Sequence, residues 1–178
     1  MNWIGKNGAK TMTTIPELLT EDIQQLDGTL SELLNHTEAT TALIMDKGGF
    51  LITHQGDHDQ FDLTTIAALA SGAFLANQTI AGLVRETNFN SVHQEGETFS
   101  LFAINIDEHC LLLVVFKAEV GVGAVKYFAR PAAQKIAGQF LLARQRNPQG
   151  GYDLSALNLM DSANLFQQVR PGTAARAT

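Results

Sequence analysis

Two histidines and two aspartates that could bind a metal lie close together in one polar segment, as His54, Asp57, His58 and Asp59. Imidazole and carboxylate groups are common ligands of zinc and related ions. Residues four apart would lie on one face of a helix, but Gly56 together with the turn-forming residues around it argues against a helix here. We therefore interpret these residues as part of a surface loop and predict no metal site.

The chain has one cysteine, Cys110, which opens an apolar run and cannot form an internal disulfide. The adjacent His109 would point to the other face of a strand, so we predict a buried and unreactive thiol. The chain has no Gly-Lys-Ser or Gly-Lys-Thr phosphate loop, and Gly121-x-Gly123 lacks the third glycine of a dinucleotide-binding motif. We therefore predict no catalytic site, no cofactor and no enzymatic activity of its own.

Composition limits the class of partner. Charged residues make up 17% of the 178 residues, against about 25% in an average soluble domain, which suggests that another protein covers part of the surface. The net charge of −6 argues against nucleic acid and anionic lipid as the main partner. The N-terminus lacks the apolar core of a secretory signal, so we expect a cytoplasmic protein.

The hydrophobic spacing predicts the elements that must position any functional surface. Apolar residues at helical spacing predict a helix from Thr20, and Asp62 is a suitable N-cap for a long helix from Leu63 to about Arg85. Two β-rich runs, 41–46 and 50–53, are joined by Gly48-Gly49 and predict a hairpin. Three further strands are predicted at 91–95, 98–105 and 110–117, and a last helix begins near Gly121.

The order α-β-β-α-β-β-β-α predicts an α/β fold, an α+β sandwich with a five-stranded, mostly antiparallel sheet and helices on both faces. Pro131 should kink or break the last helix. We expect residues 1–18 to form a flexible arm, 19–146 the domain, and 147–178 a linker with a partly disordered extension. Several apolar residues of the extension could form short amphipathic turns. They are Leu154, Leu157, Met160, Leu165 and Phe166.

The middle helix is unusual because it has no charged residue from Leu63 to Val84. Steps of 100° per residue place three sets of residues around it. The set expected to face the sheet comprises Ile66, Ala70, Phe74, Asn77, Ala81 and Val84. An apolar set beside it comprises Leu69, Ala73, Ala76, Ile80 and Leu83. The small or weakly polar set opposite comprises Thr64, Ala68, Ser71, Gly72, Leu75, Gln78, Thr79 and Gly82.

Three interpretations compete for this helix. A membrane span fits the length, but polar residues dilute it and no basic flank orients it. A helix buried within a single copy would need more chain than is available to cover it. The preferred interpretation is a helix that packs on its own sheet, places its second apolar set against a twin helix, and offers the small-residue set to another protein.

The element order resembles the roadblock family, the dynein-light-chain group with bacterial MglB-like members. The resemblance covers about 19–142 and is carried by the leading helix, the hairpin 42–52, the uncharged helix after Asp62, and the closing strand into 119–125. It implies a homodimer that joins two sheets through the third strand, which adds Val92 to the interface, and that pairs the middle helices. It also implies that the paired helices bind a small Ras-like GTPase.

The resemblance further implies that an MglB-like member accelerates GTP hydrolysis by its partner without inserting an arginine. Arg85 and Arg130 are the candidates for such an arginine finger, but we interpret both as solvated side chains at helix edges. The main hypothesis is therefore a homodimeric regulator of a small Ras-like GTPase. The alternatives are a dimeric adaptor without effect on nucleotide hydrolysis, and a sensor of a small ligand.

Overall fold

The computed structural model of the chain describes residues 15–147 and 151–152. The elements in chain order are β1 (Ile15–Pro16), α1 (Thr20–Thr37), β2 (Thr41–Asp46), β3 (Leu51–Gly56), α2 (Leu63–Leu83), β4 (Ser91–Gln94), β5 (Phe99–Asn105), β6 (Cys110–Lys117), α3 (Val122–Arg146) and β7 (Gly151–Tyr152). Apart from the two short outer strands, this order confirms the predicted α-β-β-α-β-β-β-α arrangement.

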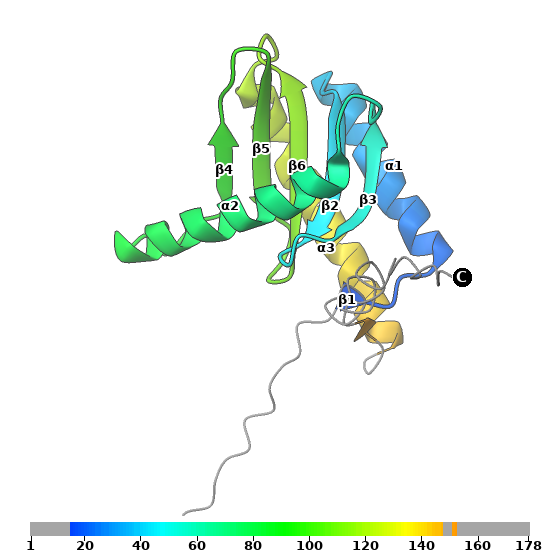
Figure 1. Cartoon of the computed structure of the whole chain (residues 1–178). Helices are drawn as coiled ribbons and strands as arrows, with labels where there is room; N and C mark the ends of the chain where they lie inside the picture. Colours follow the sequence, from blue (N-terminus) through cyan, green and yellow to red (C-terminus); the bar gives the residue numbers. More distant parts are fainter. Residues whose placement is uncertain (1–14, 148–150, 153–178) are drawn as a thin grey trace, which may run out of the picture.

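The main sheet has five strands in the order β3-β2-β6-β5-β4, and every neighbouring pair is antiparallel. Helices α1 and α3 cover one face, and α2 runs across the strands on the other face (Figure 1). The predicted five-stranded antiparallel α/β fold is therefore confirmed.

Strand β6 lies at the centre of the sheet and is buried on both sides. Leu112 and Val114 pack with α1 and α3, whereas Leu111 and Leu113 pack with α2. Successive side chains of a strand point to opposite faces, so a central strand covered on both faces must be apolar throughout. Cys110, at the start of β6, is fully buried as predicted.

The hairpin turn between β2 and β3 lies against α2. Gly49 has a φ of +91°, and a Cβ at this position would lie 2.7 Å from Cα of Ala68. Asp46 closes the turn, because its Oδ1 accepts a hydrogen bond of 2.7 Å from the N–H of Phe50. Glycine is required here both for the left-handed backbone and for the close approach of the helix.

A kink or a break was predicted at Pro131. Helix α3 runs through Pro131 without a break, so the break is wrong, and the kink stays a prediction. Buried residues on both sides of the proline, including Ala129, Ala132 and Ile136, pack on the sheet. Their burial offsets the loss of one backbone hydrogen bond, which costs about 3 kcal/mol. Pro131 itself is exposed, where water can reach the carbonyl that its missing N–H leaves free.

The sequence did not predict the small sheet formed by β1 and β7. Ile15 pairs with Tyr152 and Pro16 with Gly151, and Ile15 is buried. The last part of the predicted flexible arm is therefore docked, with Leu18 packed against the core. The rest of the arm, residues 1–14, and the extension at 148–150 and 153–178 lie outside the described residues. The boundaries 19–146 of the domain stay a prediction.

Candidate protein-interaction surface

The face of α2 that packs on the sheet agrees only in part with the predicted one: Phe74 and Ala81 are buried, and Ile66 and Ala70 pack against the same core, as predicted. The buried residues are Leu63, Ala67, Ser71, Phe74 and Ala81. This stripe repeats at steps of four, four, three and seven residues, as expected for one face of a helix. Two of the residues that were predicted to face the sheet, Asn77 and Val84, are instead exposed.

Ser71 was predicted to lie on the partner-binding face, and this position is wrong. Its side chain is buried, and its Oγ donates a hydrogen bond of 2.6 Å to the backbone carbonyl of Lys47 in the hairpin turn. A hydroxyl can be buried at low cost once its donor has a partner. Helical spacing alone could not show this, because a serine is equally compatible with a position that faces water and with one that faces a loop carbonyl.

The apolar set predicted to form the dimer interface is exposed. The exposed fraction is 70% for Leu69, 57% for Ile80 and 80% for Leu83, and Ala73 and Ala76 are exposed as well. Isolated exposed apolar residues are normal in a soluble protein, but a contiguous row marks an interaction site. This row lies on a single helix, so α2 offers an extended apolar strip.

The small or weakly polar set, apart from Ser71, is also exposed: Thr64, Ala68, Gly72, Leu75, Gln78, Thr79 and Gly82. Two polar side chains of this surface already form hydrogen bonds within the helix. Thr79 Oγ1 donates to the carbonyl of Leu75 at 2.9 Å, and the neighbouring Asn77 Nδ2 donates to the carbonyl of Ala73 at 2.8 Å. Side chains bonded in this way lose little when a partner covers them. We call both exposed sets together the α2 surface.

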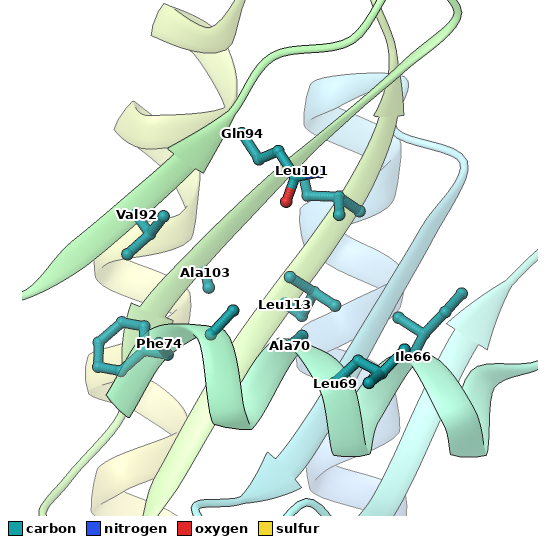
Figure 2. Close-up of a pocket in the computed structure, with 10 residues that line it drawn as sticks. Ile66, Leu69, Ala70, Phe74, Val92, Gln94, Leu101, Ala103 and Leu113 are labelled. Carbon is teal, nitrogen blue, oxygen red and sulfur yellow. The ribbon is translucent and has the colours of Figure 1, made fainter. Parts of the chain in front are cut away.

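A groove of about 290 Å³ separates the first half of α2 from strands β4 and β5. Figure 2 shows Leu69, Ala70 and Phe74 of α2 on one side and Val92 of β4 on the other. Gln94 is the one amide side chain in an otherwise aliphatic and aromatic lining. The groove therefore suits an apolar side chain and offers no set of convergent polar groups for a small polar ligand.

Strand β4 is an edge strand next to this groove. It pairs with β5 and has no second neighbour among the strands of the described chain. Its Val92 is half-buried on the same face of the sheet as α2. Helix α2 continues past β4 and beyond the sheet (Figure 1). A free edge and an overhanging apolar helix on the same side leave backbone and side-chain groups available to one partner.

The two arginines are placed differently with respect to the α2 surface. Arg85 follows α2 with a left-handed backbone, φ 62°, and is exposed. Arg130 belongs to α3, which covers the opposite face of the sheet. A protein bound to the α2 surface would thus meet Arg85 and not Arg130.

Of the histidines predicted to lie in a surface loop, His58 is exposed, whereas His54 is a half-buried residue of β3. The rings of His54 and His58 have centroids 5.1 Å apart, and His58 Nε2 lies 3.7 Å from Asp59. Within the described ranges, no group of three or more histidine, cysteine, aspartate or glutamate residues is arranged to hold a metal ion. Burial raises the pKa of the Cys110 thiol, with a further increase from the charge of Asp107, which opposes thiolate formation at neutral pH.

Comparison with solved structures finds the same fold in bacterial MglB proteins. A structure of MglB with tetrameric arrangement is 29% identical, with 72% of this chain and 96% of that chain covered and a TM-score of 0.68. Gliding protein MglB from Thermus thermophilus is also 29% identical, with 70% and 94% covered and a TM-score of 0.65. MglB of Myxococcus xanthus is 24% identical, with 71% and 96% covered and a TM-score of 0.66.

No curated protein sequence matches the chain. The sequence profile of the Roadblock/LC7 domain matches residues 26–116, which is just over half of the 178 residues. The matched range includes the hairpin, α2, the edge strand β4 and all but the last residue of the central strand β6. The chain therefore belongs to the Roadblock/LC7 domain family.

Proposed function

We propose that this protein is a homodimeric regulator of a small Ras-like GTPase. The observation that carries the proposal is the α2 surface, an uncharged and largely exposed helix face that extends past a free edge strand. The GTPase partner follows from the family and from the likeness to MglB proteins. The association between copies rests on the free edge of β4 and the exposed apolar row of α2.

A second copy is the occupant that fits the edge of the sheet best. If two β4 strands pair, the end of each α2 that extends past its own sheet would lie above the sheet of the other copy. The apolar row with Leu69, Ile80 and Leu83 would then be buried in the contact. Each of these side chains is more than half exposed in the single copy. Full burial of a side chain of this size stabilises an association by about 1.5–3 kcal/mol. Backbone pairing along β4 adds direction and register to the contact.

A membrane is a poorer occupant. Helix α2 has the length and composition of a membrane span, but its Leu63, Ala67 and Phe74 are packed against the sheet. Insertion would have to remove these side chains from the core. The Roadblock/LC7 fold instead leaves the other faces of the helix available to proteins.

The GTPase is assigned to the part of the α2 surface that faces away from the second copy. Thr64, Gly72 and Gln78 represent this side, which has small side chains and no charge. An activator without an arginine finger must act by positioning the GTPase's own catalytic residues. The placement of Arg130 on the opposite face of the sheet agrees with such a mechanism, and Arg85 is the residue to test against it.

The dimer is tested by placing a charge in the predicted seam. Ala73→Arg or Ala76→Arg should convert the dimer to a monomer, because each puts an unpaired guanidinium in an apolar contact. Both residues are exposed in the single copy, so the fold should persist. Mass is measured by light scattering after size exclusion at micromolar concentration. Gln24→Arg, on an exposed position of α1, is the matched control and should remain dimeric.

The regulatory activity is tested with the purified small Ras-like GTPases of the same organism. We expect the wild-type dimer to raise the rate of GTP hydrolysis, Arg85→Ala to retain that effect, and Ala73→Arg to lose it. Binding with an unchanged hydrolysis rate would favour the adaptor alternative. Failure of every one of these GTPases to bind would contradict the proposal.

A further inference from the structure

A second group of exposed apolar side chains lies far from α2 in the fold, where α1 begins and α3 ends. Leu19, Leu141 and Leu142 are 47%, 56% and 56% exposed. Leu141 and Leu142 belong to the last turns of α3, and Leu19 is the N-cap residue of α1. These helices cover the sheet face opposite α2, so the proposed dimer contact would leave the three leucines uncovered. We call them the leucine patch.

Leu142 of the patch borders a groove that also contains a polar network. Asp22 accepts hydrogen bonds from Gln139 at 2.7 Å and from Arg146. This network holds the first turn of α1 against the last turns of α3. Leu142 lies in the wall of a groove of about 480 Å³ together with Gln25 and Arg146. The groove therefore has an apolar margin on a rigid base.

The chain returns to this end of the molecule after α3. Strand β7 pairs with β1, and β1 contacts α3. The residues that follow Tyr152 thus start beside the end of the domain that carries the leucine patch. From 153 to 170 the sequence has no glycine and no proline, and it would span about 27 Å as a helix at 1.5 Å per residue. Its large apolar residues are Leu154, Leu157, Leu159, Met160, Leu165, Phe166 and Val169.

We propose that the segment 153–166 of the same chain docks on the leucine patch. The distance suits this occupant, because Leu154 is only two residues from the anchored Tyr152, and a short tether makes the contact effectively intramolecular. The N-terminal arm begins from the same strand pair, but it has Gly5 and Gly8 and fewer large apolar residues, so its ordering would cost more for less burial. This proposal does not depend on the GTPase partner.

The experiment is amide hydrogen exchange on the full-length protein. Amides of 154–166 should exchange at least about tenfold more slowly than in an unstructured peptide. The double variant Leu141→Asp with Leu142→Asp should lose this protection. Tyr127→Asp is the control, since Tyr127 is an exposed residue near the start of the same helix, and it should keep the protection. Deletion of 1–14 should keep it as well.

A disulfide test distinguishes the same chain from a second copy. The pair Leu142→Cys with Leu157→Cys should form a bond within one chain under mild oxidation, with Cys110 buried and unable to compete. Disulfide-linked dimers would overturn docking within one chain. Exchange of 154–166 at the unstructured rate in the wild type, or protection that survives the double aspartate variant, would overturn the leucine patch as the site. Circular dichroism of each variant checks that the domain is folded.

Discussion

At the scale of single residues, Asp22 is a buried carboxylate that links two helices. Burial raises its pKa, but hydrogen bonds from Arg146, from the Leu19 N–H and from Gln139, with the charge of Arg146, lower it by more, so that the pKa lies below the ordinary 3.8. A group with a depressed folded pKa stabilises the fold above its unfolded pKa. That contribution is lost as the pH falls through the folded pKa.

We expect Asp22→Asn to lower the free energy of unfolding by about 1 kcal/mol at pH 7, because it leaves the Leu19 N–H, Gln139 and the part-exposed Arg146 without a charged acceptor. The difference from the wild type should shrink as the pH falls from 3.8 through the lower pKa of the folded protein, where the wild-type carboxylate also becomes neutral. Urea denaturation at several pH values measures it. Glu32→Gln, in the exposed pair with Lys135, is the control and should change stability little. An equal loss at low and neutral pH would contradict the role of the charge.

At the scale of elements, helix and strand positions were predictable because periodicity depends on local sequence. The uncharged stretch after Asp62 and the apolar run at Cys110 each identified an element correctly. The orientation of α2 was less accurate, because Ser71 is buried through a bond to the Lys47 carbonyl, a contact set by the tertiary fold. The two-residue strands β1 and β7 were missed, since a pair so short has no periodic signal.

Two glycine substitutions can separate the stability of the helices themselves from the contact that α2 makes with a partner. Gly72 and Gly28 both lie inside helices, and a Cβ at either position would meet nothing within 4 Å. Gly72→Ala and Gly28→Ala should each stabilise the isolated domain by about 0.5–1 kcal/mol, as measured by thermal unfolding. If the partner's backbone approaches Gly72, only Gly72→Ala should weaken GTPase binding. Equal binding by both variants would mean that no such approach occurs.

At the scale of the whole molecule, the surfaces assigned to self-association and to the chain's own extension lie on opposite faces of the sheet. The α2 surface and β4 are on one side, and the leucine patch is on the helices of the other. The two contacts should therefore be independent. Sites on separate surfaces with no shared side chains contribute to stability almost additively.

Removal of 151–178 is expected to leave the dimer intact. Because Gly151 and Tyr152 pair with β1, deletion of 153–178 is the cleaner form of this test. Light scattering should give twice the monomer mass for this truncated protein, and Ala73→Arg in the same background should return it to a monomer. A monomeric truncated protein alongside a dimeric full-length protein would place the extension in the dimer contact instead.

The two halves of α2 are held very differently. Ser71 and the close approach of Gly49 to Ala68 bind the first half to the hairpin turn, whereas the second half, apart from Ala81, is exposed to solvent in a single copy. Substitutions at the buried positions of α2, most of them in the first half, must satisfy the demands of folding. Those at its exposed positions would be limited, in the proposed dimer, by association. Under the proposed function, the choice of partner would therefore depend on a few exposed side chains of one helix, which can change at little cost to the fold.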